Sequence, residues 1–317
     1  MALRVAFFGT PAFAVPTVDA LARSPHTIVG VVTQPDRPRG RGQKTRPGAV
    51  KEAALALGVP VLQPERLKTP EFMSAFADLG ADIAVVAAYG KLLPQALLDT
   101  PRLGMINVHA SLLPRWRGAA PIHRAILAGD AVSGITIMRV VLALDAGPMI
   151  SRIEVPVGAN ETSVELEARL ADEGARLAVA ALDALENGTA TEAPQDEALV
   201  TYAERLTRED SQIDWTRPAQ AIHDQVRGLH PWPLTAAQLG GVRLRLIHSR
   251  VADHPDAPVP PGTVVAADRE GIRVQTGAGQ LLITALRPEG RNVMGAAEFL
   301  NGRPVAPGTR VEPVPFP

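Results

Sequence analysis

The first 190 residues alternate between short apolar runs and amphipathic segments. The apolar runs are rich in Val and Ile and nearly continuous, which is typical of buried parallel strands. We place these strands at residues 3–9, 28–33, 59–62, 83–89, 104–109 and 135–141. Helical segments are predicted between them, at residues 14–23, 48–57, 70–79, 94–99 and 118–129. This alternation predicts an α/β fold with an open, doubly wound, mostly parallel Rossmann-like sheet.

The later pattern predicts one long helix, a linker and a second domain. The helix begins at Ser163, an N-cap residue with Glu165 and Glu167 in the first turn, and ends near Asn187-Gly188. A helix over 217–229 precedes short strands separated by Gly, Asp and Pro, which predict a smaller C-terminal antiparallel β-barrel of OB-like type. The strands are predicted at residues 242–247, 262–265, 271–275 and 279–284. The predicted boundaries are 1–189 for the first domain, 190–209 for a polar linker and 210–317 for the barrel domain.

Composition narrows the class of protein. A chain of 317 residues exceeds the usual size of one hydrophobic core, in agreement with two domains. It contains no cysteine, which excludes disulfides and thiolate metal ligands and fits a reducing compartment. There is no signal-peptide core and no run of 18 apolar residues, so we expect a soluble, cytoplasmic protein. The net charge of −1 gives no general argument for a polyanionic partner, and any nucleic-acid contact must come from local clusters.

The candidate chemistry centres on residues 105–118, MINVHASLLPRWRG. Asn107, His109 and Ser111 alternate with apolar residues, so a strand places them on one side. Pro114 lacks an amide hydrogen and ends the strand. Ligands bind at the carboxyl ends of strands in open parallel sheets, where an amide, an imidazole and a hydroxyl can serve an acyl centre. The alternative is an edge strand with solvated polar residues.

Asp145 is the second candidate, in a turn that follows the strand at 135–141. Beside His109 it would form a coupled acid–base pair able to move a proton near neutral pH. An aspartate in a turn with Gly147 and Pro148 also serves as a turn former, which is the structural alternative.

These residues resemble the signature of the folate-dependent formyltransferases, and the resemblance extends over nearly the whole chain. The segments that carry it are Asn107 to Pro114, Arg117 to Ile122, Leu144-Asp145-x-Gly147, Gly9-Thr10-Pro11, Thr33 to Pro38, Asp214-Trp215 and Pro231-Trp232-Pro233. The resemblance implies transfer of a formyl group from 10-formyltetrahydrofolate, a co-substrate, to the α-amino group of methionyl-initiator tRNA in translation initiation. It implies no metal and no membrane partner, and we expect a monomer.

The resemblance also implies roles for the site residues. Asn107 and His109 would donate hydrogen bonds to the tetrahedral oxyanion, an effect of about 10²–10³ in rate per donor. Asp145 would orient and charge His109 and relay the proton of the amine towards the departing N10. The folate-binding rim would be shaped by Ser111, Leu112, Leu113 and Pro114. Many members of the family have an acidic residue and a glycine where this chain has Val141 and Ala143.

A basic segment lies between Gln34 and Pro47, with five Arg or Lys and one Asp. Its content of Pro and Gly predicts a long loop without helix or strand, at the same sheet end as Asn107. Positive charge beside a catalytic cleft suits a phosphate-bearing substrate, and the resemblance implies that the loop enters the acceptor arm of the tRNA. The tRNA-binding residues would be Arg37, Arg39, Arg41, Lys44 and Arg46, with Arg41 foremost. The alternative is a solvated, flexible loop.

Other functions stay open at this point. Pro11 and Ala14 replace glycines of the dinucleotide fingerprint after Gly9, so a dehydrogenase is not expected. A nucleotide-sugar N-formyltransferase would share the chemistry but would not need the basic segment, and a non-catalytic tRNA-binding module would transfer no formyl group. In the barrel, Arg243 and Arg245 have the charge to contact phosphates. The alternative is that they simply lie on the solvent-exposed face of a strand. The residues Trp215, Trp232 and Pro233 are expected in a core between the domains.

Overall fold

The chain forms two compact units. The computed structural model describes residues 2–39 and 44–314, with the side chains of 38, 39 and 44–46 left out. The first unit comprises Met1–Pro121, Val132–Pro156 and Glu167–Ala203, and the second comprises Ile122–Ala131, Val157–Leu166 and Glu204–Pro317. The two units therefore interleave along the sequence, and residues 190–203 belong to the first.

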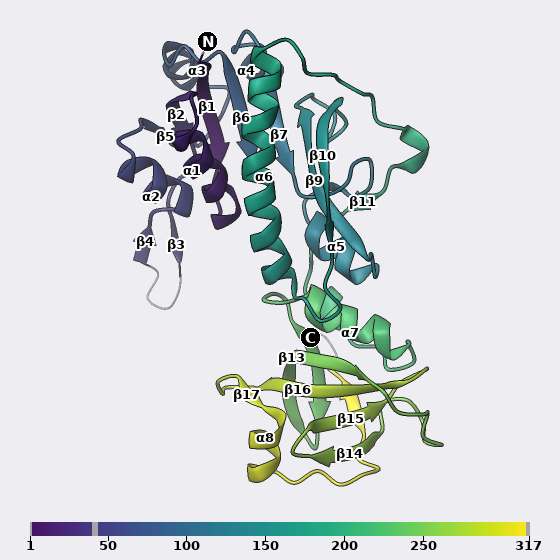
Figure 1. Ribbon diagram of the computed structural model, residues 1–317. Coiled ribbons are helices and arrows are strands. Elements are labelled where there is room, and N and C mark those ends of the chain that lie inside the picture. Colours follow the sequence, from purple (N-terminus) through teal and green to yellow (C-terminus); the bar gives the residue numbers. More distant parts are fainter. Residues whose placement is uncertain (1, 40–43, 315–317) are drawn as a thin grey trace. The chain divides into compact units, whose positions relative to one another are not determined.

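The first unit is built on a seven-stranded sheet in the order β10-β9-β7-β6-β1-β2-β5 (Figure 1). Its strands are β1 (Arg4–Gly9), β2 (Thr27–Val32), β5 (Val61–Leu62), β6 (Ile83–Ala87), β7 (Met105–His109), β9 (Val132–Arg139) and β10 (Met149–Pro156). The strands from β5 to β7 are parallel, which confirms the predicted mostly parallel sheet. The prediction of another parallel strand at 135–141 is wrong, because β9 runs antiparallel to β7. β10 was not predicted and pairs antiparallel with β9, to which residues 140–148 connect it.

The helices of this part of the chain agree with the sequence pattern. They are α1 (Val15–Arg23), α2 (Ala49–Ala56), α3 (Pro70–Asp78), α4 (Gln95–Leu98), α5 (Pro121–Leu127) and α6 (Ser163–Glu186). A Cβ on Gly174 of α6 would lie 2.8 Å from Cγ1 of Val108 on β7, so this glycine lets α6 approach the sheet closely. Figure 1 shows α6 running along the sheet.

The opposite face of the sheet carries a separate core and the candidate site. There Phe8, Val86 and Met105 cluster with residues of α3 and α4. Side chains alternate along β7, so Asn107 and His109 share the face of Met105 and point away from α6. The sequence pattern thus places the candidate side chains on a face that α6 does not cover.

The second unit contains an antiparallel sheet in the order β14-β15-β16-β13-β12-β18, with β17 beside β16. Its elements are α7 (Ala219–Gly228), β12 (Thr235–Leu239), β13 (Val242–Ala252), β14 (Val264–Asp268), β15 (Gly271–Gln275), β16 (Gln280–Pro288), β17 (Met294–Gly295), α8 (Ala296–Gly302) and β18 (Val311–Pro313). A bridge between Thr263 and Arg310, next to β14 and β18, joins the two ends of this sheet. The predicted antiparallel barrel is confirmed.

Two tryptophans behave differently in this unit. Trp215 is buried in the core of the barrel itself, with residues such as Leu244 and Ile283, which differs from the predicted position between the domains. Trp232 is 51% exposed, so the expectation of a core position is wrong for it. The adjoining Pro233 is buried. None of the helices in the described part of the chain has the length and apolar content that crossing a membrane requires.

Candidate active site

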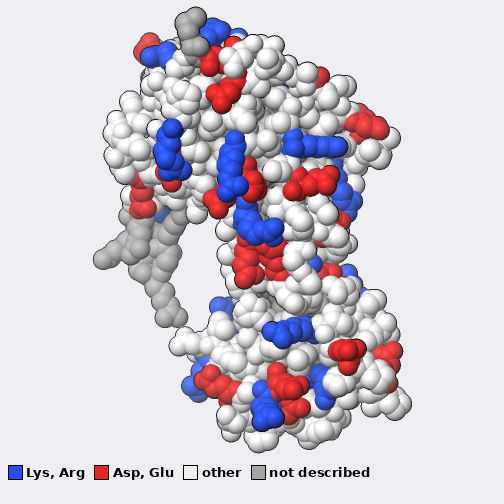
Figure 2. Space-filling view, viewed as in Figure 1, with Lys and Arg blue, Asp and Glu red and all other residues white. Residues whose placement is uncertain are grey.

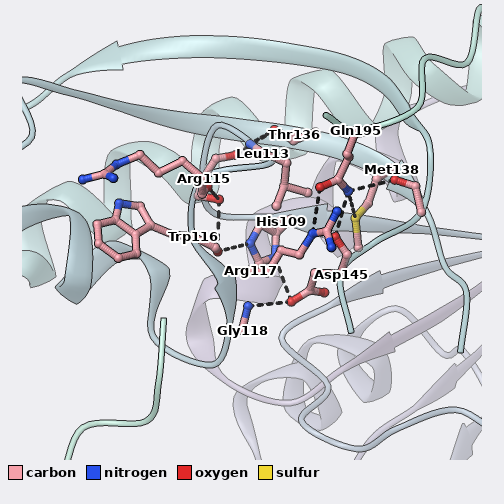
Figure 3. Close-up of polar contacts among 12 residues, drawn as sticks. His109, Leu113, Arg115, Trp116, Arg117, Gly118, Thr136, Met138, Asp145 and Gln195 are labelled. Carbon is pink, nitrogen blue, oxygen red and sulfur yellow. Dashed lines mark hydrogen bonds and ion pairs between the residues drawn. The ribbon is translucent and has the colours of Figure 1, made fainter. Parts of the chain in front are cut away.

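The imidazole of His109 is fixed at the carboxyl end of β7 (Figure 3). The residue is only 5% exposed. Its Nε2 lies 2.8 Å from the carbonyl oxygen of Trp116, and because a carbonyl can only accept, Nε2 carries the hydrogen. Its Nδ1 lies 3.8 Å from Oδ2 of Asp145, which is longer than a hydrogen bond. The ring therefore presents Nδ1 to the carboxylate without a direct hydrogen bond to it.

The carboxylate of Asp145 is oriented by the backbone conformation of the residue and by a hydrogen bond. Its φ of 46° lies in the left-handed region, which aspartate tolerates better than most residues. Oδ2 accepts a hydrogen bond of 2.9 Å from the amide of Gly118. The structure thus brings together His109 and Asp145, two of the three residues expected to be catalytic.

Asn107 lies two residues before His109 on the same side of β7. It stands opposite Val86 of β6 and Met138 of β9, and it is partly exposed. Among the described residues, none forms a hydrogen bond with its side-chain amide. An amide in this position can donate to a ligand without breaking an existing bond.

The segment expected to form the folate rim is a tightly held turn. The Ser111 hydroxyl is buried and donates to the carbonyl of Arg115 at 2.6 Å. Leu113 is fully buried, while Leu112 and Pro114 are partly exposed. Ser111 and Leu113 therefore shape the turn from inside, and only the other two present side-chain surface.

Thr136 supports this turn from β9. Its hydroxyl donates to the carbonyl of Ser111 at 2.7 Å and accepts from the amide of Leu113 at 3.1 Å. Thr136 was not among the predicted site residues, although a threonine between Ile135 and Ile137 in an apolar strand is a usable signal.

Gln195 joins the turn around Asp145 to Arg117, as Figure 3 shows. Its Nε2 donates to the carbonyls of Asp145 at 2.8 Å and Gly147 at 2.9 Å, and its Oε1 accepts from Nε of Arg117 at 3.0 Å. The segment was expected to be a linker. Instead, β11 (Tyr202–Ala203) also pairs with β8 (Arg117–Gly118). Nothing in the polar sequence around residue 195 signals this contact.

Gly147 permits the close return of the turn towards β9. A Cβ on this residue would lie 1.8 Å from the carbonyl oxygen of Arg139, which is a backbone atom and cannot easily move aside.

We expect Gly147→Ala to lower the melting temperature by roughly 2–10 °C, because overpacking costs about 1–3 kcal/mol, and to lower turnover. Thermal unfolding measures this. The control is Gly302→Ala, where a Cβ meets open space. Equal melting temperatures for the two variants would contradict the clash.

The basic segment contains a short hairpin, which corrects the prediction of a loop without strands. β3 (Arg37–Arg39) pairs antiparallel with β4 (Lys44–Arg46). A two-stranded ladder has only edge strands, where Pro38 is tolerated. The register sets Arg37 opposite Arg46 and Arg39 opposite Lys44. Arg41 lies outside the described residues.

Asp36, the single acidic residue of this segment, forms hydrogen bonds with residues outside the segment. Oδ2 of Asp36 accepts from Nζ of Lys51, and its Oδ1 accepts from Nε2 of Gln63. The hydrogen bonds from Lys51 and Gln63 lower the pKa of Asp36 below its ordinary value. Asp36 therefore anchors the base of the hairpin to α2. On the face of the first unit that Figure 2 shows, basic and acidic residues are interspersed.

A second group of possible metal ligands lies away from this site. His26, Asp183 and Glu186 offer ligand atoms within 4.8 Å of one another. The amide of Leu3 donates to Nδ1 of His26, which leaves the hydrogen on Nε2, facing Oδ1 of Asp183 at 3.2 Å. A metal on Nε2 would need the opposite tautomer. The bonding therefore fits an imidazole–carboxylate pair and not a metal site.

Comparison with known proteins gives full-length relatives. Residues 3–182 match the family described as formyl transferase, and residues 205–304 match its C-terminal domain. A methionyl-tRNA formyltransferase of Thiobacillus denitrificans is 48% identical over 309 residues, covering 98% of this chain and 99% of the relative. One from Moorella thermoacetica is 45% identical over 306 residues, covering 96% and 98%.

Solved structures share the fold at low identity. HypX from Aquifex aeolicus, in complex with tetrahydrofolic acid, has a TM-score of 0.63 at 15% identity and covers 95% of this chain. This chain spans about half of that protein, 47%. An N-formyltransferase from Helicobacter canadensis, in complex with folinic acid and dTDP-3-aminofucose, has a TM-score of 0.67 at 15% identity, covering 89% of this chain and 98% of that one. At these identities the likeness shows the fold alone.

Proposed function

Because this chain belongs to the formyl transferase family, we propose that it transfers a formyl group from 10-formyltetrahydrofolate to the α-amino group of methionyl-initiator tRNA in the cytoplasm. The observation that carries the chemistry is the approach of the His109 imidazole to the Asp145 carboxylate, at 3.8 Å at the carboxyl end of β7. Full-length identity of 48% and 45% to two methionyl-tRNA formyltransferases supports the acceptor.

The reaction needs an oxyanion site and a proton route. The acceptor amine, with a pKa of about 8 or below, is partly neutral at working pH, so no strong base is required. Its nitrogen forms a bond to the formyl carbon, and after a tetrahedral intermediate the bond from that carbon to N10 breaks. The amine loses one proton and N10 gains one. This route requires neither a metal nor a covalent intermediate on the protein.

We assign the steps to particular atoms. The amide of Asn107 donates to the oxyanion. Nδ1 of His109 is the ring nitrogen that faces the reaction, because Nε2 is occupied by the carbonyl of Trp116. Protonated at Nδ1, the ring donates to the oxyanion while the nearby carboxylate of Asp145 stabilises the positive charge. The same pair passes the proton of the amine towards N10.

The folate has an apolar surface available beside Asp145. The loop before it exposes Val141, Leu142 and Leu144, at 40%, 60% and 50%. Exposed apolar side chains next to a polar site are typical of a ligand-binding wall. In our proposal this loop and the rim formed by Leu112 and Pro114 bind the folate.

In our proposal the basic hairpin binds the acceptor arm of the tRNA through Arg37, Arg39, Arg41, Lys44 and Arg46. The five basic residues between positions 37 and 46 favour a polyanionic partner. We expect Arg41→Ala to raise KM for the charged tRNA, to leave kcat unchanged, and to lower the slope of log KM against log salt by about one. Steady-state kinetics at several salt concentrations measure this. Arg23→Ala, an exposed arginine at the end of α1, is the control. A KM equal to that of the control would contradict a role of Arg41 in tRNA binding.

The function itself is tested by offering two acceptors in parallel. Purified protein and 10-formyltetrahydrofolate are incubated with methionyl-initiator tRNA or with an amino-nucleotide sugar, and formylated product is quantified. We expect product only with the tRNA. Product only with the sugar would establish a nucleotide-sugar N-formyltransferase, and no product with either would support a non-catalytic tRNA-binding module.

A further inference from the structure

We propose that Gln195 is a positioning residue that sets the carboxylate of Asp145 against His109. The inference rests on the proposed formyl transfer, and it adds a residue from outside the strands that carry the reacting groups. The hydrogen bonds of Gln195 to this turn go to the carbonyls of Asp145 and Gly147, so it acts through the backbone of the turn.

The two hydrogen bonds donated by Gln195 hold the turn on both sides of Ala146. One amide nitrogen bonds the carbonyls of Asp145 and Gly147 at 2.8 and 2.9 Å. Gln195 is buried, at 9% exposure, so water does not readily replace these bonds. They stabilise a turn in which Asp145 has a φ of 46°, a conformation that persists only when surrounding contacts enforce it.

Arg117 determines which way the Gln195 amide faces. A glutamine amide can turn over and exchange its oxygen and nitrogen. Here Nε of Arg117 donates to Oε1, which directs Nε2 to the turn. The buried guanidinium is itself held by Glu197, at 2.8 Å from Nη2 to Oε1. The orientation of Gln195 is therefore fixed by a cation that can only donate.

These contacts form a closed ring that includes the carboxylate of Asp145. Arg117 is followed by Gly118, whose amide donates to Oδ2 of Asp145, and the backbone of Asp145 returns through Gln195 to Arg117. Both ends of the aspartate, backbone and carboxylate, are thus tied to the same two-residue strand. A displacement of about 1 Å at a reacting group can cost about 10²-fold in rate, so this ring bears directly on turnover.

Two substitutions distinguish positioning of the Asp145 turn by Gln195 from a purely structural role of Gln195 as the hydrogen-bond partner of the buried Arg117. Gln195→Glu keeps an acceptor for Arg117 but loses the amide donor to the turn, whereas Gln195→Ala loses both the acceptor and the donor. We expect kcat to fall about tenfold to a hundredfold in both variants, with KM for both substrates within about twofold of wild type. In a chain already carrying Asp145→Asn, Gln195→Glu should give no further loss. Wild-type kcat in Gln195→Glu would overturn the proposal.

A second readout does not depend on activity. Amide hydrogen exchange of Gly118 should be faster in both Gln195 variants than in wild type, because the carboxylate no longer holds its position. The control is Gln95→Ala, at an exposed glutamine of α4 whose amide donates to the exposed Asp99, which should keep wild-type kcat and exchange. Unchanged exchange in both Gln195 variants would overturn the proposal. An absence of formyl product from wild type refutes only the proposed function, and the exchange rates still decide the role of Gln195.

Discussion

Replacing Asp145 by asparagine should lower kcat by about 10²–10⁴, the range for loss of a positioned acid–base group. Asparagine keeps the size of the side chain, and its oxygen can still accept from the amide of Gly118. It carries no charge to stabilise His109 and cannot take a proton. We therefore expect a folded protein that binds both substrates and turns over slowly. Single-turnover formyl transfer, with folate binding measured separately, tests this.

The matched control for this change is Asp172→Asn. Asp172 is exposed on α6, on the helix that lies against the other side of the sheet. Its replacement should leave kcat and KM at wild-type values. Normal turnover in Asp145→Asn would remove the proton route through His109 and Asp145.

Asn107→Ala should lower kcat by about 10²–10³, the usual loss for one oxyanion donor. The side-chain amide has no hydrogen-bond partner among the described residues, so its removal leaves no protein group unpaired. Melting temperature and folate affinity should therefore stay close to wild type. Asn107→Asp, which keeps the shape but replaces the donor by a negative charge, should be at least as slow. Rapid-quench measurement of the chemical step gives the comparison.

Asn187→Ala provides the control, because Asn187 is exposed at the end of α6. It should behave as wild type in every assay. If Asn107→Ala retained normal kcat, the oxyanion would have to be stabilised by His109 and backbone amides alone.

The sequence predicted the parallel core well because its strands obey a simple rule. β1, β6 and β7 are buried on both faces and read as apolar runs. β10 was missed because Arg152 and Glu154 are exposed on an edge strand, which interrupts the apolar run. The hairpin at β3 and β4 was missed because a three-residue ladder depends on backbone pairing and not on side-chain pattern.

The site was predictable only where its residues are close in sequence. Strand periodicity placed Asn107 and His109 together, and the turn residues marked the region of Asp145. The occupation of Nε2 by a carbonyl depends on Trp116, whose φ of 65° is not encoded by a recognisable motif. Gln195 is 78 residues away from Arg117 along the chain, and no local pattern reports such a pairing.

The pairing of β11 with β8 has a practical consequence for dissecting the enzyme. Residues 3–182 correspond to the N-terminal family segment, yet a fragment cut at that point would lack Gln195 and β11. The turn around Asp145 would then lack both hydrogen bonds from Gln195, and β8 would lack its partner strand. Truncation meant to isolate the chemical step must keep the polypeptide through Ala203.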